Sequence, residues 1–170
     1  MKIAVCPGSF DPVTLGHMDI IRRASQLFDR VIVVVMTNAS KQPLFTQVQR
    51  MELLNRAVQA EGLANVVVDC YDGLLADYVQ QHAADVVVKG LRAMSDFEYE
   101  FQMALTNRKL NPRAETVFLT TTAEHMYLSS SLVKQVAHYG GDISGFVPPC
   151  IIADIAEKYR KDRLNDECHN

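Results

Sequence analysis

Several features that would place the chain in a common class are missing from its 170 residues. There is no tryptophan, and the four cysteines are Cys6, Cys70, Cys150 and Cys168. They form neither a CxxC pair nor a zinc-binding pattern, so we expect no protein-bound metal and, given how often free cysteine is buried, buried free thiols. The net charge of −3 leaves no broad basic surface, which argues against nucleic acid as a partner.

Long apolar runs are also absent. No stretch approaches the length of a membrane-spanning helix, so we expect no membrane partner. Met1 and Lys2 lead directly into the apolar run Ile3–Val5, which leaves no room for a signal peptide ahead of a core strand. These absences together predict a protein of the reducing cytoplasm.

The usual phosphate-binding fingerprints are missing as well. The chain has no GxxxxGK[ST] motif and no GxGxxG motif, which excludes a P-loop NTPase and gives no indication of dinucleotide binding. Any phosphate would therefore be bound by a few local cations and by main-chain N–H groups.

What is present is an alternation of β-branched runs and helical periods. The runs are Ile3–Val5, Val31–Met36, Val66–Val68, Val86–Val88 and Val117–Leu119. They are continuously apolar, as expected for parallel strands covered on both faces. We predict an α/β fold: a Rossmann-like sheet of five parallel strands with helices on both faces. One domain is expected over residues 1–160, followed by a polar tail, 161–170, that frays.

Each predicted helix has an apolar stripe expected to face the core. The stripes are Ile20, Ile21, Ala24, Leu27 and Phe28; Val48, Met51, Leu54 and Val58; Leu74, Leu75, Tyr78 and Val79; Phe97, Phe101, Ala104 and Leu105; Leu132, Val133, Val136 and Ala137; and Ile151, Ile152, Ile155 and Tyr159. Thr46 and Gln49 form a capping box before the second stripe, and Pro149 suits the first turn of the last helix. The aromatic set Phe97, Tyr99 and Phe101 is more typical of packing or subunit contact than of base stacking.

The loop after the first strand holds the first candidate site. In open α/β sheets, ligands bind beyond the carboxyl ends of the strands. Gly8 and Gly16 permit close approach of a ligand, and Gly16 and His17 open a helix whose free N–H groups favour phosphate. By position alone, His17 either donates a hydrogen bond to phosphate or packs beside Ile20, and Ser9 is either a ligand contact or a turn residue.

Further motifs favour the functional interpretation of His17 over the packing one. Pro7–His17 reads PGSFDPVTLGH, Leu128–Lys134 reads LSSSLVK, and Lys89–Leu110 begins KGLRAMSDFEYE. With the segment Asn38–Leu44, these motifs resemble the nucleotidyltransferase superfamily and, more narrowly, bacterial phosphopantetheine adenylyltransferases. The resemblance runs from about residue 3 to 160. One departure concerns binding: Lys89 stands where the family usually has arginine, so a point charge replaces a planar two-pronged donor.

The resemblance implies transfer of AMP from ATP to 4′-phosphopantetheine, giving dephospho-coenzyme A and pyrophosphate. The acceptor phosphate is already a nucleophile, so alignment and charge stabilisation suffice without a side-chain general base. The implied catalytic residues are His17, which would stabilise the transition state, Lys41 and Arg92.

Binding residues are implied in the same way. For the acceptor they are Ser9, Lys41, Leu75 and Lys89; for ATP they are Ser9, Phe10, His17, Gly90, Leu91, Arg92, Glu100, His125, Met126, Tyr127, Leu128, Ser129, Ser130 and Ser131. Without the motifs, Lys41 reads as a solvated cation and Arg92 as a partner of Asp96 or Glu98. The three serines also form a helix cap, which is compatible with phosphate binding because both use the same N–H groups.

The resemblance further implies Mg²⁺ that arrives with ATP, a homohexamer, and feedback binding of coenzyme A. Two alternatives are related transferases: a nicotinamide mononucleotide adenylyltransferase and a cytidylyltransferase. The block from Lys89 to Glu100 disfavours both. An alternative of another class is a non-catalytic nucleotide-binding regulator, against which the presence of His17, Lys41 and Arg92 argues.

Overall fold

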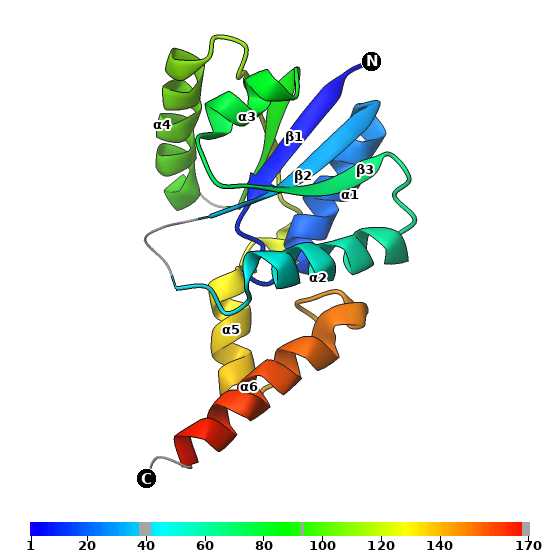
Figure 1. Ribbon diagram of the computed structural model, residues 1–170, viewed down its shortest axis with the longest axis vertical. Helices are drawn as coiled ribbons and strands as arrows, with labels where there is room; N and C mark the ends of the chain where they lie inside the picture. Colours follow the sequence, from blue (N-terminus) through cyan, green and yellow to red (C-terminus); the bar gives the residue numbers. More distant parts are fainter. Residues whose placement is uncertain (38–41, 93, 168–170) are drawn as a thin grey trace.

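A single parallel sheet forms the centre of the molecule (Figure 1). The computed structural model describes residues 1–37, 42–92 and 94–167, of which 94–96 and 161–167 are described by their main chain only. The strands are β1 (Ile3–Gly8), β2 (Arg30–Met36), β3 (Val66–Tyr71), β4 (Val86–Leu91) and β5 (Thr116–Thr120). All pair in parallel, in the order β3-β2-β1-β4-β5, which confirms the predicted five-stranded Rossmann-like sheet.

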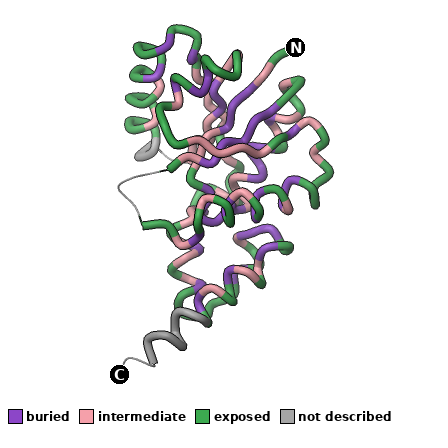
Figure 2. Tube along the Cα trace, in the orientation of Figure 1, coloured by how far each residue is buried: buried purple, intermediate pink, exposed green. Residues whose placement is uncertain are grey.

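Helices pack on both faces of this sheet. They are α1 (Leu15–Leu27), α2 (Gln47–Ala60), α3 (Leu75–Gln81), α4 (Met94–Leu110), α5 (Ser130–His138) and α6 (Ile152–Glu167), with 3₁₀ turns η1 (Ala123–His125) and η2 (Pro149–Ile151). Alternate residues of β2 show the division: Val33 belongs to a large core with α1, α2, α5 and α6, whereas Val34 belongs to a smaller one with α3. Buried residues are concentrated along β1 and β2 (Figure 2).

Local signals begin the helices where the sequence predicts. The Thr46 side chain accepts the Gln49 N–H, and the Gln49 side chain accepts the Thr46 N–H, so the capping box before α2 is confirmed. Pro149 opens the η2 turn that leads into α6.

Several positions predicted to be in the core are exposed. Leu27 is 63% exposed because it is the last residue of α1, and Leu74 is exposed because it caps α3 instead of lying within it. Val48 is exposed in the first turn of α2. The edge strand β3 also exposes Val67, because only one neighbouring strand shields it. At Leu27, Leu74 and Val48 the stripe predictions were wrong, because the periodic sequence pattern extends beyond the part of each helix that packs on the core.

The fourth helix carries the most exposed apolar stripe. On α4, Phe97, Phe101 and Leu105 are exposed. The aromatic side chains of this helix were expected either to pack within the chain or to contact another subunit, and the chain itself leaves them largely uncovered. The helix contacts α3 and β4, and Figure 2 shows much of its length as exposed. These apolar side chains do not contribute to the core of a single chain.

The main chain of residues 161–167 continues α6 as a helix to Glu167. The prediction of buried free thiols was correct only in part. Cys6 is buried as predicted, but Cys70 is only half-buried and Cys150 is exposed at the η2 turn, while Cys168 lies outside the described residues. Among the helices described, none has both the length and the apolar character needed to cross a membrane.

Candidate active site

The sheet opens between β1 and β4. β1 pairs with β2 over six residues, but with β4 only at Ala4–Val86 and Val5–Val87. Beyond Val5 the two strands continue to Gly8 and Leu91 at the same edge of the sheet. The strand order reverses here, and a crevice at such a switch point is where open α/β sheets bind ligands. The loop after β1, the start of α1, the end of β4 and the start of α5 supply many of the predicted site residues.

His17 is held in place by the start of its own helix. Thr14 is the N-cap of α1, and its hydroxyl accepts the His17 N–H at 3.2 Å. In return, the Thr14 N–H donates to His17 Nδ1 at 3.0 Å. This is a capping box in which an imidazole takes the place of the usual glutamate or glutamine. Because Nδ1 accepts, the proton of the neutral ring is on Nε2, which is then a donor.

The surroundings of His17 keep its ring neutral. Burial, and secondarily the positive charges of Arg92 and Lys89, lower the pKa of His17 from 6.5 to about 4. At neutral pH the imidazole is therefore an uncharged donor through Nε2, suited to an anionic oxygen. The reading of His17 as a simple packing residue explains neither this capping geometry nor the two nearby cations.

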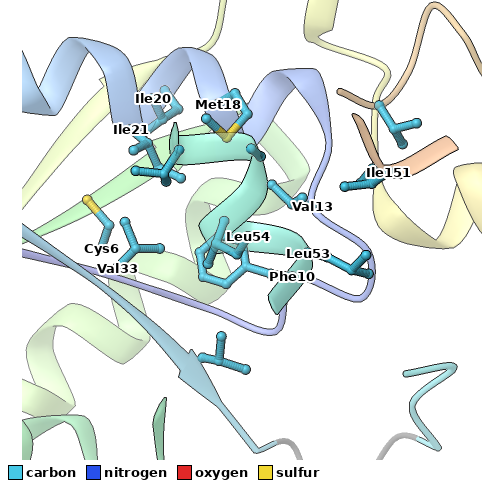
Figure 3. Close-up of a cluster of buried hydrophobic side chains, with 14 of the residues drawn as sticks. Cys6, Phe10, Val13, Met18, Ile20, Ile21, Val33, Leu53, Leu54 and Ile151 are labelled. Atoms are coloured by element: carbon cyan, nitrogen blue, oxygen red, sulfur yellow. The ribbon is translucent and has the colours of Figure 1, made fainter. Parts of the chain in front are cut away.

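The loop that precedes α1 has a strained, buried centre. Phe10 is 5% exposed and has a φ of +47°, a conformation that a bulky residue rarely adopts. Its ring lies in the core with Val33 and Leu54 (Figure 3) and meets the His17 ring edge-on, with ring centroids 5.1 Å apart. A Cβ at Gly8 would lie 2.8 Å from the Phe10 ring. The buried ring is therefore not available for the ATP contact predicted at Phe10, which leaves its main chain for that contact, while Ser9 is exposed.

Asp11, for which no role was predicted, joins three segments. Its Oδ2 accepts the Leu44 N–H at 2.9 Å and lies 3.0 Å from Lys134 Nζ, and its Oδ1 accepts the Phe45 N–H at 2.9 Å. The carboxylate is buried. The signal was available, because Asp11 and Lys134 belong to the two motifs, but nothing in the sequence shows that residues 123 positions apart pair.

The start of α5 lies beside the same loop. Ser129 is the N-cap, and its hydroxyl accepts the Leu132 N–H at 3.1 Å. The Ser130 hydroxyl donates to the Pro12 carbonyl at 2.8 Å, and the Arg92 guanidinium donates to the Leu128 carbonyl at 2.8 Å. The cap prediction for the serines is confirmed, and α1, α5 and the end of β4 meet at one place.

Main-chain N–H groups at both helix starts are available to a ligand. The Leu15 N–H is bonded to the Phe146 carbonyl at 2.9 Å. Within the described part of the chain, the N–H groups of Gly16, Ser130 and Ser131 have no acceptor. Two helix N-termini that present such donors form a natural cradle for phosphate oxygens.

The end of β4 carries Lys89, which with Arg92 is one of the two cations near His17. Lys89 Nζ lies 3.2 Å from Glu100 Oε2 on α4, and both side chains are largely shielded from solvent. A Cβ at Gly90 would lie 2.9 Å from Ile20 Cγ1, so glycine permits β4 to pack closely against α1. Gly90 thus has a packing reason in addition to its predicted ATP contact, and Leu91 beside it is half-buried.

The remaining predicted residues lie in three places. His125 is half-buried in η1, where its Nδ1 lies 2.9 Å from the Thr122 hydroxyl. Nearby, the Leu128 side chain is buried, whereas three residues are exposed: Met126, Tyr127 and Ser131. Leu75 packs in the second core with Met36 and Tyr71, beside the ends of β2 and β3. Lys41 lies outside the described residues. No group of three His, Cys, Asp or Glu side chains that could bind a metal ion exists among the residues described.

Comparison with known families and proteins places the chain among nucleotidyltransferases. Residues 5–136 match the cytidylyltransferase-like family model. A phosphopantetheine adenylyltransferase of Alkaliphilus metalliredigens is 54% identical over 158 residues, which cover 93% of this chain and 99% of that protein. A protein of the same name from Clostridium tetani is 55% identical over 158 residues, covering 93% of this chain and 98% of that one.

Solved structures share the fold at low identity. A nicotinic acid mononucleotide adenylyltransferase of Plasmodium falciparum, complexed with NaAD, has a TM-score of 0.68 and 15% identity, and the match covers 97% of each chain. A lipopolysaccharide core biosynthesis protein of Thermoplasma volcanium has a TM-score of 0.52 and 21% identity, covering 72% of this chain and 97% of that one.

Proposed function

The chain belongs to the phosphopantetheine adenylyltransferase family, within the cytidylyltransferase-like group, and from this premise we propose that it transfers AMP from ATP to 4′-phosphopantetheine. An oxygen of the acceptor phosphate forms the new bond to the α-phosphorus of ATP. The bond from that phosphorus to the bridging oxygen breaks, and pyrophosphate leaves with the electron pair. The products are dephospho-coenzyme A and pyrophosphate.

The observation that carries this proposal is the fixed, neutral His17. Its Nε2–H is a donor to an α-phosphate oxygen as negative charge builds there, and its orientation is set before any ligand arrives by the bond from Thr14 to Nδ1. Because Nε2 already carries a proton and Nδ1 is bonded to Thr14, the ring does not act as a general base. The proposed reaction needs no general base, since its nucleophile is already ionised. Alignment of the reacting groups therefore accounts for the rate acceleration.

The other roles follow from the groups that meet at the ends of β1 and β4. The free N–H groups at the starts of α1 and α5 would bind the triphosphate, together with Ser129–Ser131 and Arg92. Lys89 would bind the acceptor phosphate in exchange for part of its contact with Glu100. Lys41 and Leu75 would complete the acceptor site. Mg²⁺ would be held mainly by ATP oxygens, where it neutralises phosphate charge.

Three wider properties are part of the same proposal. We expect a protein of the cytoplasm, assembled as a homohexamer and inhibited by coenzyme A through the acceptor site. The exposed Phe97, Tyr99 and Phe101 on α4 support a contact between subunits, since large apolar groups gain free energy when covered.

One assay tests the proposed activity. The protein is incubated with ATP, Mg²⁺ and 4′-phosphopantetheine, and dephospho-coenzyme A is measured by mass spectrometry while pyrophosphate is measured enzymatically. The reverse reaction, from dephospho-coenzyme A and pyrophosphate, should yield ATP. Parallel reactions replace ATP by CTP, or the acceptor by nicotinate or nicotinamide mononucleotide. Turnover only with one of these replacements, or ATP binding with no turnover at all, would contradict the proposal.

A further inference from the structure

Arg50 lies inside the protein, on α2, and has no role in the reaction as described above. It is 4% exposed. Its Nη1 donates to the Ser9 carbonyl at 2.8 Å and to the Met36 carbonyl at 3.4 Å. Its Nε is buried and has no acceptor in the described part of the chain. Among the described residues, the side chain therefore bonds only to main-chain carbonyls, just beyond the end of β1 and at the end of β2.

Packing and charge pairing do not account for an arginine at this position. Arg22 and Arg56 each lie beside a carboxylate, whereas Arg50 has no such partner among the described residues. A buried guanidinium without a counter-ion is costly. An apolar side chain, such as that of Leu53 or Leu54 on the same helix, would fill the space without this cost. The bond to Ser9 is the feature that distinguishes Arg50.

The Ser9 carbonyl belongs to the peptide unit that precedes Phe10. Rotation of that peptide plane changes φ of Phe10, which is held at +47° in the left-handed region. A bulky residue stays there only when its surroundings impose the conformation. The bond from Arg50 fixes the orientation of this peptide unit from inside the protein, and so supports the unusual backbone of Phe10.

The Phe10 backbone in turn determines where its ring lies against His17, at a centroid distance of 5.1 Å. A continuous set of contacts thus runs from Arg50 through Ser9 and Phe10 to the imidazole. We propose that Arg50 is a positioning residue, which orients His17 by holding the Ser9–Phe10 peptide. As a statement about catalysis, this inference rests on the proposed function.

The test is an Arg50→Met variant, which keeps much of the side-chain volume but removes the donors. We expect kcat for the AMP transfer to fall roughly 10–100-fold, since small misplacement of a catalytic group has effects of this size. NMR of the ligand-free protein should also show shifted His17 ring resonances, because the Phe10 ring moves. These resonances are identified among the five histidines by their loss in a His17→Gln variant. Arg50→Lys, which retains a cation, should lie between wild type and Arg50→Met in both measurements.

Arg56→Met is the matched control. It removes an arginine from the same helix, with its contacts to Asp154 at 2.7 Å and to the Cys150 carbonyl at 3.3 Å. It should lower the unfolding temperature but leave kcat and the His17 resonances unchanged. This separates a positioning role from general loss of stability.

The proposal is overturned if Arg50→Met has wild-type kcat and wild-type His17 resonances, whatever its stability. If Arg50→Met does not fold, wild-type resonances and kcat in both Arg50→Lys and Arg50→Gln overturn it equally. The NMR measurement needs no substrate. A failure of the proposed reaction would therefore appear as absent turnover in the wild type, and would still leave the link from Arg50 to His17 testable.

Discussion

The two sides of the switch point, at the ends of β1 and β4, are built differently. On the β1 side, the loop from Ser9 to Thr14 is bonded at nearly every step to its own chain, through Arg50, Lys134, Ser130 and His17. On the β4 side, Lys89 pairs with Glu100 on α4, a helix whose outer face is apolar and exposed, and Arg92 donates to the Leu128 carbonyl. The β1 side is held by hydrogen bonds within the chain, whereas the β4 side lies beside an apolar surface that the chain leaves uncovered.

This contrast separates two requirements of a transferase. The site of bond making needs groups held within a fraction of an ångström, which an internal network of hydrogen bonds provides. The proposed acceptor side needs to admit 4′-phosphopantetheine and release the product, which a cation with an exchangeable partner permits. We therefore expect the β1 side to determine rate and stability, and the β4 side to determine acceptor affinity and assembly.

Loss of His17 should have the largest effect. His17→Ala should lower kcat by about 10²–10³ or more, since it removes a donor aimed at transition-state charge. His17→Gln should be comparably slow but more stable than His17→Ala, because the new amide can form with Thr14 the same capping box that Gln49 forms with Thr46 at α2. Steady-state kinetics and thermal unfolding measure both. Near-normal turnover in either variant would remove His17 from the mechanism.

Loss of Asp11 should come next, as a loss of stability. Asp11→Ala leaves two main-chain N–H groups and the Lys134 ammonium without their acceptor, and should cost about 3 kcal/mol of unfolding free energy. Lys134→Met should cost less, because Asp11 keeps both N–H donors. Urea unfolding measures the loss of unfolding free energy in each variant. Equal losses in Asp11→Ala and Lys134→Met would mean that the Asp11 carboxylate does not join the three segments.

Acid should weaken the β1 side through His17. The native pKa is about 4 and the ordinary value is 6.5, so the unfolded chain binds the proton more readily. The stabilisation is complete above pH 6.5 and is lost as pH falls through 4, by about 2 kcal/mol after allowance for partial exposure. His17→Gln lacks this titration. Between pH 7 and pH 4 the unfolding free energy of the wild type should therefore fall relative to that of His17→Gln. Parallel curves for the two proteins would contradict a shielded, neutral His17 ring.

On the β4 side, Lys89→Met should raise KM for 4′-phosphopantetheine about tenfold, the effect of one lost charge-assisted hydrogen bond. Lys89→Arg should retain most of the affinity. Initial rates over a range of acceptor concentrations measure this. A fall in kcat with unchanged KM would place Lys89 with the rate-determining groups and blur the contrast between the two sides.

The smallest effect on chemistry should come from the outer face of α4. Phe101, 47% exposed, contributes nothing to the core of one chain, so Phe101→Glu should leave the fold intact. It should shift the assembly to smaller species in analytical ultracentrifugation, with a much smaller change in kcat per chain. An unchanged sedimentation coefficient would mean that this face is not the contact.

The sequence predicted well whatever depends on short-range patterns. The strands, the capping box at Thr46 and the serine cap at Ser129 follow from periodicity and local hydrogen bonding. The sequence left the role of the α4 stripe open between packing and subunit contact, because an apolar stripe looks the same whether it faces its own core or another surface. Asp11 and Arg50 were missed for a different reason: their partners are distant in the chain, and a charged residue in a sequence carries no mark of burial.

The box between Thr14 and His17 has a consequence for how tightly a nucleotide can be held. A free imidazole would lose rotamer freedom on binding, a cost of about 0.5–1.5 kcal/mol for such a side chain. Here that entropy was already lost when the first turn of the helix formed. Folding has thus prepared the ring for an incoming ligand, and the affinity of the site is correspondingly less reduced by ordering.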